Sequence, residues 1–509
     1  MADAALNRLL IDLGDENATT RLAEDLAMIL GPGDVIRLEG DLGAGKTSFA
    51  RALIRAFADD PLHEVPSPTF TLVQSYDFTR LTISHFDLYR LTDPDELDEI
   101  GFDEAIRSGA ALIEWPERAD DVIPRDALTL RLHNGPTTES RIVEIIAPGN
   151  WEPRLQRTLS IRAFLTRAGW GNAARRYLKA DASSRSLERV SLVGATRILM
   201  NHPKESGDAA GEARRLARAR AKLAEDTTSF VAIALALREL GLSAPRIDAH
   251  DPDAGFVLME DFGHAFIAEA GQPIEARYRA AVDVLADLHQ RELPHDLPDG
   301  SGGVFQLPEY DLDDLLTQLE PFPDWGIPHL MGREATAEER RSFADAWRPC
   351  LTEILAAPKT WALRDYHSPN LMWLPERDGA ARVGLLDFQD AVWLHPAYDL
   401  ASVAQDARVT ISPDLEERLV AHYVSRRKNA DPAFDNEAFQ RAYAILAAQR
   451  ATRILGIFAR LSRRDGRYDY LVHYPRVLDY LARPLRAPVL SDVRDWMVRH
   501  AGVVKSTLT

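Results

Sequence analysis

The octapeptide at residues 40–47 constrains the fold of the first third of the chain more than any other feature. It reads GDLGAGKT and matches the phosphate-binding pattern G-x-x-x-x-G-K-[S/T]. A short strand-like run precedes it and an amphipathic helical pattern follows, which is the context that the pattern requires. The sequence therefore predicts a P-loop domain in which nucleotide phosphates are bound by Gly40, Asp41, Leu42, Gly43, Ala44, Gly45, Lys46 and Thr47.

Three side chains complete this predicted site. The Thr47 hydroxyl is expected to ligate Mg²⁺. Asp87 ends a strand-like run, and a P-loop needs a second acidic metal ligand at the end of a neighbouring strand. An isolated aspartate is more often a solvated loop residue, so only the nearby P-loop favours metal binding. Glu114 ends a further apolar run and is the candidate for orienting an attacking water.

A second catalytic pattern occupies residues 361–399. Asp365 precedes Asn370 by five residues, and an apolar run then leads to Asp387. Kinase-like phosphotransferases use this order: an aspartate meets the acceptor hydroxyl, and an asparagine and a second aspartate hold the metal ions. The sequence predicts Asp365 as the catalytic base and Asn370 and Asp387 as magnesium ligands. A purely structural turn at Asp365 and Asn370 fits less well, because the next strand again ends in an aspartate.

The triplet Asp-Phe-Gly at residues 261–263 has the letters of the metal-binding motif of protein kinases but precedes Asp365. We therefore interpret residues 259–263 as a hinge between two lobes, where backbone groups meet adenine. The usual strand lysine that pairs with phosphates has no clear counterpart, since the strand pattern ends in Met200. The predicted nucleotide contacts in the hinge are Met259, Glu260 and Asp261.

Several weaker candidates surround these motifs. Ser183 and Ser184 lie in a polar loop suited to cover phosphates, although plain connecting hairpins have the same composition. Asp399 is expected to brace the catalytic loop through backbone hydrogen bonds. Carboxylates beside aromatic faces suit sugar rings, but an exposed helix before a proline-rich turn looks similar. The candidate sugar contacts are Glu320, Phe322, Trp325 and Asp390.

Charge and length limit the possible architectures and partners. The 509 residues exceed what one hydrophobic core supports, so two or three domains are expected. The net charge is -18, and residues 1–150 hold 13 Lys and Arg against 28 Asp and Glu. Such an acidic segment is a poor match for a nucleic-acid backbone. The single cysteine excludes an intrachain disulfide, and without an apolar span a cytoplasmic protein is expected.

The segments GDLGAGKTSFARAL, VPSPTFTLVQSY, HFDLYRL and ALIEWPERA together resemble TsaE, the P-loop ATPase family of the bacterial tRNA threonylcarbamoyladenosine machinery. The resemblance spans nearly all of residues 5–150. It implies that ATP hydrolysis supports partner proteins that modify adenosine-37 of certain tRNAs. Because residues 1–150 are acidic, we expect no direct tRNA binding by this domain. It also implies that Thr69 is a nucleotide-sensing switch residue. The alternative is a nucleotide-dependent assembly module with weak hydrolysis.

The segments LRDYHSPNLMWL and GLLDFQDAVWLHPAYDLASVAQDAR resemble the aminoglycoside phosphotransferase superfamily, within it the anomeric kinases for N-acetylmuramate and N-acetylglucosamine of cell-wall recycling. The resemblance covers about residues 155–490. It implies a kinase-like fold, ATP and Mg²⁺ as cofactors, and phosphorylation of the C1 hydroxyl of an amino sugar. An aminoglycoside, a choline-like compound or another small hydroxyl compound is the alternative acceptor.

The expected fold class is therefore α/β, with a P-loop NTPase domain followed by a bilobal protein-kinase-like domain. We predict the first domain at residues 1–150 and the second at residues 155–509. Within the second, the predicted parts are an N-lobe at 155–260, the hinge at 259–263 and a C-lobe at 264–490.

Overall fold

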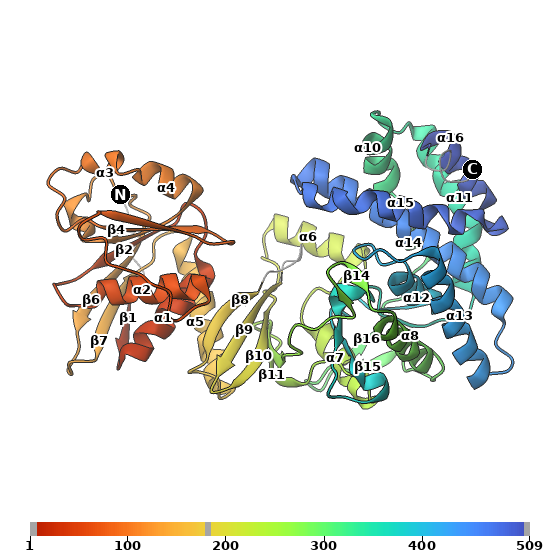
Figure 1. Ribbon diagram of the computed structural model, residues 1–509, viewed down its shortest axis with the longest axis horizontal. Helices are drawn as coiled ribbons and strands as arrows, with labels where there is room; N and C mark the ends of the chain where they lie inside the picture. Colours follow the sequence, from red (N-terminus) through yellow and green to blue (C-terminus); the bar gives the residue numbers. More distant parts are fainter. Residues whose placement is uncertain (1–7, 179–184, 503–509) are drawn as a thin grey trace. The chain divides into compact units, whose positions relative to one another are not determined.

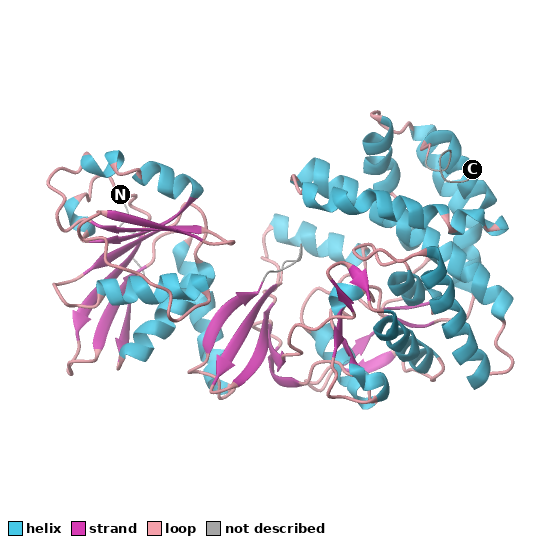
Figure 2. Cartoon of the chain, in the orientation of Figure 1, coloured by secondary structure: helices cyan, strands magenta, loops and turns pink. Residues whose placement is uncertain are grey.

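The computed structural model describes residues 8–178 and 185–502, and the chain forms two compact units (Figures 1 and 2). The first unit comprises Met1–His202 and Asp248–Asp261, and the second comprises Pro203–Ile247 and Phe262–Thr509. The chain passes between the units after His202, Ile247 and Asp261, and the last of these points falls inside the predicted hinge. The predicted domain boundary near residue 150 lies within the first unit.

The P-loop part of the first unit is a seven-stranded sheet in the order β1-β7-β6-β2-β5-β4-β3. Its central strands β4, β5, β2 and β6 are parallel, and β1, β7 and β3 pair antiparallel at the two sides. The strands are β1 (Arg8–Leu13), β2 (Val35–Glu39), β3 (Val73–Asp77), β4 (Thr82–Asp87), β5 (Gly109–Glu114), β6 (Leu128–Asn134) and β7 (Arg141–Ile146).

Helices cover both faces of this sheet, as a buried parallel sheet requires. Alternate residues of β2 point to opposite faces: Ile36 and Leu38 pack in one core with α1 (Glu16–Ile29) and α2 (Lys46–Ala58). Val35 packs in the other core with α3 (Glu96–Glu99) and α4 (Phe102–Ser108). This arrangement confirms the P-loop α/β fold that the sequence predicts.

The remainder of the first unit is an antiparallel sheet in the order β11-β12-β10-β9-β8, with α5 (Trp151–Arg167) packed on it through a shared core. Its strands are β8 (Ala174–Leu178), β9 (Ser186–Leu192), β10 (Ala195–Asn201), β11 (Ile247–Asp251) and β12 (Phe256–Glu260). Val193 and Gly194 form the tight turn between β9 and β10, and both have positive φ angles, 42° and 77°. That backbone matches the two-residue turns preferred in hairpins.

A buried group of charges joins α1 to the five-stranded sheet. The Arg175 side chain on β8 is fully buried, and its Nη1 donates to Asp25 Oδ1 on α1 at 2.6 Å. Its Nε and Nη2 donate to the two carboxylate oxygens of Glu188 on β9 at 2.7 and 2.9 Å. Arg162 on α5 donates to the same Asp25 carboxylate, and Thr158 donates to the Asp25 carbonyl oxygen. The P-loop domain and the β8–β9 hairpin are thus held together by desolvated, fully paired charges.

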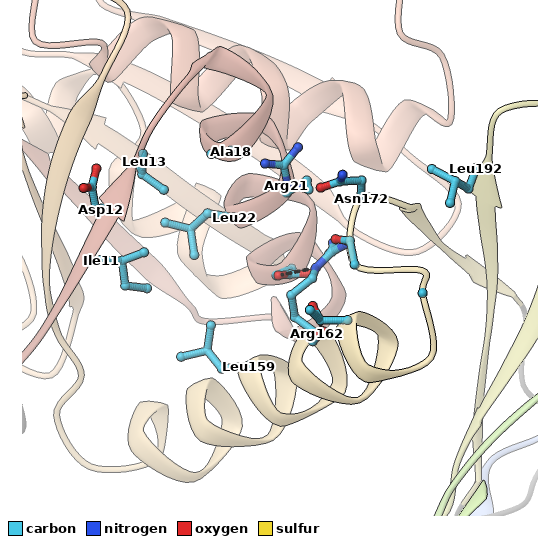
Figure 3. Close-up of a pocket in the computed structure, with 14 residues that line it drawn as sticks. Ile11, Asp12, Leu13, Ala18, Arg21, Leu22, Leu159, Arg162, Asn172 and Leu192 are labelled. Carbon is cyan, nitrogen blue, oxygen red and sulfur yellow. Dashed lines mark hydrogen bonds and ion pairs between the residues drawn. The ribbon is translucent and has the colours of Figure 1, made fainter. Parts of the chain in front are cut away.

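A cavity of about 510 Å³ lies beside these charges, between the β1–α1 segment and α5 (Figure 3). Figure 3 shows Leu22 and Leu159 on its apolar side and Arg162 on its polar side. Asp25, the partner of Arg162, also lines the cavity. At the rim of the same contact, Arg176 on β8 pairs with Glu24 and with Asp59, which ends α2.

The second unit is mainly helical, with short two-stranded sheets around the catalytic tract (Figure 2). The tract runs through two such sheets, β17–β20 and β18–β19. The long helix α14 (Asn436–Asp465) is buried over much of its length, and Phe458 is one of its core residues. No helix among the described residues is long and apolar enough to cross a membrane.

The elements of this unit, in chain order, are α6 (Ala209–Arg220), α7 (Thr228–Glu239), β13 (Ala268–Glu269), β14 (Gln272–Pro273), α8 (Glu275–His289), β15 (Asp296–Pro298), β16 (Val304–Gln306), α9 (Leu312–Thr317), α10 (Ile327–Met331), α11 (Ala337–Ala356), β17 (Thr360–Ala362), β18 (Leu371–Trp373), β19 (Val383–Leu385), β20 (Val392–Leu394), α12 (Ala397–Ala404), α13 (Pro413–Ala430), α14 (Asn436–Asp465), α15 (Tyr474–Ala482) and α16 (Ser491–His500).

Candidate active sites

The P-loop connects β2 to α2 and depends on glycine at its first position. Gly40 has a φ of 140°, and a Cβ there would lie 2.4 Å from the carbonyl oxygen of Leu132. Only glycine fits such a backbone and such a contact. Gly43 and Gly45 also have positive φ angles, 80° and 106°. The remaining loop residues Asp41, Leu42 and Ala44 lie between these glycines, so the predicted phosphate-binding segment is one strand-to-helix turn.

Lys46 begins α2 and points back over the loop. Its Nζ donates to the carbonyl oxygens of Gly40 and Asp41, at 2.6 and 2.9 Å, and lies 3.7 Å from the centre of the Trp115 ring. Burial lowers the pKa of Lys46, while the carboxylates of Glu114 and its neighbours act in the opposite direction. A desolvated ammonium beside an aromatic face interacts strongly with an added anion.

The two predicted acidic residues stand side by side. Asp87 and Glu114 are register partners at the ends of the parallel strands β4 and β5. The Thr47 hydroxyl donates to Glu114 Oε2 at 2.9 Å, and His85 Nε2 lies 2.9 Å from Glu114 Oε1. The structure thus places the predicted residues Thr47, Asp87 and Glu114 close together, with His85 beside them.

Thr69 contacts the predicted metal ligand directly. The Thr69 hydroxyl donates to Asp87 Oδ2 at 2.6 Å, and the Ser67 hydroxyl oxygen lies 2.8 Å from the Thr69 hydroxyl oxygen. Phe70, the next residue, is 80% exposed. A change at Asp87 when nucleotide binds can therefore alter the position of the exposed Phe70 ring through Thr69. This arrangement is compatible with the predicted switch role of Thr69.

In the second unit, the three predicted catalytic residues lie together. Asn370 Nδ2 donates to the Asp365 carbonyl oxygen at 2.9 Å and lies 3.4 Å from Asp387 Oδ2. The backbone N–H of Leu386 donates to the Asn370 carbonyl oxygen at 2.9 Å, which joins the start of β18 to the end of β19. Gln389 Nε2 donates to the other Asp387 oxygen at 2.9 Å. Asp387 has a positive φ of 56°, a strained backbone of the kind found at functional sites.

Asp399 braces the loop before Asp365, as predicted. Its two carboxylate oxygens accept the backbone N–H groups of Leu363 and Arg364 at 2.6 and 2.9 Å. This holds Arg364 at a positive φ of 67°. Burial raises the pKa of the fully buried Asp399 to about 7, although the two hydrogen bonds act to lower it.

The Asp365 carboxylate is kept ionised by its surroundings. Its side chain is 37% exposed, and His367 Nε2 lies 3.8 Å from its Oδ1. Burial acts to raise the pKa of Asp365, but the His367 imidazole and the guanidinium groups of Arg364 and Arg453 outweigh it and hold the pKa well below its usual range. A carboxylate that stays charged at neutral pH can accept a hydrogen bond from an acceptor hydroxyl.

The predicted hinge lies at the end of β12. Met259 is buried and pairs with Ile198 of β10, and Glu260 pairs with Arg197. The Asp261 carboxylate accepts from Arg189 Nε at 2.7 Å. Ser183 and Ser184 lie outside the described residues.

The candidate sugar contacts are not equally placed. Phe322 is fully buried and stacks on Phe343 with ring centroids 5.9 Å apart, so it is a core residue and its face is not offered to a ligand. Glu320 is exposed and Trp325 half-buried at the same turn. Asp390 Oδ1 accepts the backbone N–H of Ala224 at 2.7 Å, which leaves its second oxygen for other contacts.

Sequence reasoning missed His85, Trp115 and His367. His85 is fully buried, and among the described residues its Nδ1 has no hydrogen-bond partner, so its polar contact there is with Glu114. In the sequence, His85 could have been recognised as a polar residue inside the apolar strand-like run that ends in Asp87. For Trp115 the signal was its place directly after Glu114.

Both sites offer oxygen ligands to Mg²⁺. No group of three or more His, Cys, Asp or Glu side chains in residues 8–178 and 185–502 is arranged to hold a metal ion. Mg²⁺ is usually held by one or two protein oxygens together with substrate phosphates and water. The Asn370–Asp387 pair and the Thr47–Asp87 set fit that mode, because each could supply one or two protein oxygens.

Known proteins resemble each part separately. Residues 13–143 match the family model described as threonylcarbamoyl adenosine biosynthesis protein TsaE, and residues 176–438 match the phosphotransferase enzyme family. The chain is 38% identical over 360 residues to the N-acetylmuramate/N-acetylglucosamine kinase of Caulobacter vibrioides, covering 68% of this chain and 98% of that protein.

The N-terminal part has its own relatives. It is 39% identical over 120 residues to the tRNA threonylcarbamoyladenosine biosynthesis protein TsaE of Rickettsia bellii, covering 24% of this chain and 83% of that protein. With the TsaE protein of Rickettsia felis the identity is 48% over 105 residues, covering 21% of this chain and 61% of that protein. Both resemblances predicted from the sequence are confirmed. The chain belongs to the phosphotransferase enzyme family and carries a TsaE-family P-loop ATPase domain on its N-terminal side.

Proposed function

We propose that residues 155–509 phosphorylate the C1 hydroxyl of N-acetylmuramate or N-acetylglucosamine with ATP. The observation that carries this proposal is the grouping of Asp365, Asn370 and Asp387 in a chain 38% identical to a kinase named for these sugars. Asp365 is the proposed base, and Asn370 and Asp387 the proposed magnesium ligands. Mg²⁺, when bound, neutralises phosphate charge during transfer.

The proposed mechanism follows from the charge state of Asp365. A hemiacetal hydroxyl at C1 is more acidic than an ordinary alcohol, so a carboxylate is a sufficient partner for it. Asp365 orients this hydroxyl and receives its proton as the oxygen attacks the terminal phosphorus of ATP. The bond from that phosphorus to the bridging oxygen breaks, and ADP leaves. Asp399 fixes the backbone on which Asp365 stands, and Gln389 fixes the orientation of Asp387.

We also propose that residues 1–150 hydrolyse ATP in support of partner proteins that install threonylcarbamoyl groups on adenosine-37 of tRNA. Glu114 orients the attacking water, Thr47 and Asp87 hold Mg²⁺, and Thr69 senses the nucleotide. The hydrogen bonds that join Thr47 to Glu114 and Thr69 to Asp87 support these assignments. The partners are expected to be proteins, because the domain is acidic.

Two substitutions in the full chain test the proposal. Lys46→Ala should abolish the tRNA modification activity reconstituted with partner proteins and leave sugar phosphorylation intact. Asp365→Asn should abolish sugar phosphorylation, followed by NMR of the product at C1, and leave tRNA modification intact. Loss of both activities from either substitution in a folded protein would contradict two separate sites. Phosphate on an aminoglycoside or choline-like compound, and never on C1 of either amino sugar, would refute the sugar assignment.

A further inference from the structure

Helix α14 carries a row of arginines past the catalytic tract. Arg450, Arg453 and Arg460 are spaced by three and seven residues, so they share one face of the helix. The first of them, Arg450, is buried and donates to the Gln405 carbonyl oxygen at 3.3 Å. Arg453 contacts the Tyr398 hydroxyl through Nη1 at 3.3 Å. This contact brings the row to the catalytic tract, because Tyr398 precedes Asp399, whose carboxylate holds the loop before Asp365.

Arg453 and Arg460 lack anionic partners. Within the part of the chain that the structure describes, neither guanidinium lies within 4.0 Å of a carboxylate oxygen, and the buried Nε of Arg460 has no acceptor. By contrast, Arg441 on the same helix pairs with Glu353, and Arg464 pairs with Asp465. Guanidinium groups stay charged in proteins, and a partly desolvated charge without a counter-charge is destabilising unless a ligand supplies one.

The segment proposed for sugar contacts lies on α14 between these two arginines. A Cβ at Gly456 would meet the backbone carbon of Pro321 at 2.4 Å, so glycine at this position lets the turn after Glu320 rest directly on the helix. Arg453 and Arg460 are about 10 Å apart along the axis at 1.5 Å per residue. A hexose ring with a substituent on O3 has a comparable length, so a sugar that contacts the turn after Glu320 can present that substituent to these two arginines.

We propose that Arg453 and Arg460 form a carboxylate subsite that binds the lactyl group of N-acetylmuramate. This inference rests on the proposed sugar-kinase function and specifies how that site recognises one of its two sugars. N-acetylglucosamine has a hydroxyl at O3 where N-acetylmuramate has the lactyl ether, so only the second sugar carries a carboxylate. Arginine binds carboxylates through two parallel charged hydrogen bonds, which are stronger than neutral ones.

The matching test uses the full chain and compares the two sugars. Arg453→Gln and Arg460→Gln are each expected to raise KM for N-acetylmuramate, so that the ratio of kcat/KM for N-acetylmuramate to that for N-acetylglucosamine falls about 10- to 100-fold. Arg441→Gln removes the same charge from α14 at an exposed ion pair and should leave the ratio unchanged. Arg453→Lys keeps a charge but not the planar fork and should restore part of the ratio.

A second measurement needs no substitution and so does not depend on the variants folding. The methyl ester of N-acetylmuramate keeps the shape of the sugar and removes the carboxylate charge, and the unaltered enzyme should use it about 10- to 100-fold less well than the acid. KM for ATP, measured alongside, separates a sugar carboxylate from a nucleotide phosphate as the bound anion.

The outcomes are distinct. An unchanged ratio, an equal loss for both sugars, a rise in KM for ATP alone, or equal use of acid and ester would each overturn the subsite. Phosphorylation of neither sugar by the unaltered enzyme would instead overturn the proposed function, and the subsite with it.

Discussion

The buried charges around Asp25 allow a quantitative test of how the two functional parts are joined. Asp25 is 2% exposed and accepts hydrogen bonds from both Arg175 and Arg162. Asp25→Asn keeps the shape of the side chain and removes its charge, which leaves Arg162 only the Glu24 carboxylate, at 4.0 Å, and leaves Arg175 the Glu188 carboxylate. Removing one partner of a buried ion pair costs about 3–5 kcal/mol. We expect the free energy of opening the β8–β9 hairpin to fall by that amount.

Hydrogen exchange of β8 and β9 amides in the full chain measures this opening free energy directly. A loss of about 3 kcal/mol corresponds to exchange faster by about a hundredfold. The matched control is Asp59→Asn, which breaks the ion pair with Arg176 at the edge of the same contact, where the Asp59 side chain is 75% exposed. Exposed pairs contribute about 0–1 kcal/mol, so exchange should change by less than about fivefold. Equal effects of the two substitutions would refute the reasoning from desolvation.

Two further predictions concern single side chains at the two sites. His85→Ala should lower the rate of ATP hydrolysis, measured in the absence of sugar, by at least tenfold, because Glu114 loses the His85 contact that orients it. His85→Gln should recover part of that rate. An equal loss of rate in both variants would contradict a positioning role for His85. Sugar phosphorylation should rise with pH around 7, since the Asp399 carboxyl accepts both backbone N–H groups only when ionised, and Asp399→Asn should remove that step from the profile. The pKa of Asp399 is raised from 3.8 to about 7 on folding, so between about pH 4 and 7 the folded protein binds more protons than the unfolded chain. The contribution of Asp399 to the free energy of unfolding therefore decreases as pH rises through this window.

The features that the sequence predicted well are those set by short-range chain geometry. The P-loop is one strand, one turn and one helix, and Asp365 and Asn370 are held five residues apart by a single loop. Asp87 and Glu114 could be placed together because the ends of neighbouring parallel strands meet at one edge of a sheet. In each case residue type and local spacing specify the position of the side chain.

The features that the sequence did not reveal depend on distant segments. Asp25 and Arg175 are 150 residues apart, and neither has a neighbouring pattern that identifies the other. Phe322 was predicted to contact the sugar because it is an aromatic residue beside carboxylates, but its backbone packs against Gly456 on α14 and its side chain is buried in the core. His85 is a polar residue in an apolar strand, and only the pairing of β4 with β5 shows that it faces Glu114.

The discontinuity of the first unit bears on the order in which the protein folds during synthesis. Chains emerge from the ribosome N-terminus first, and domains fold as they emerge. The P-loop sheet is complete once β7 has been made, whereas the five-stranded sheet needs β12, which pairs with β10 only after residues 203–247 have also been synthesised. During that interval β8 and β9 lack their full sheet, and the unpaired edge of β10 is exposed to incorrect pairing. The finished P-loop domain already presents Glu24 and Asp25 to Arg175 and Arg176, so we expect it to act as the template on which the first strands of the kinase fold.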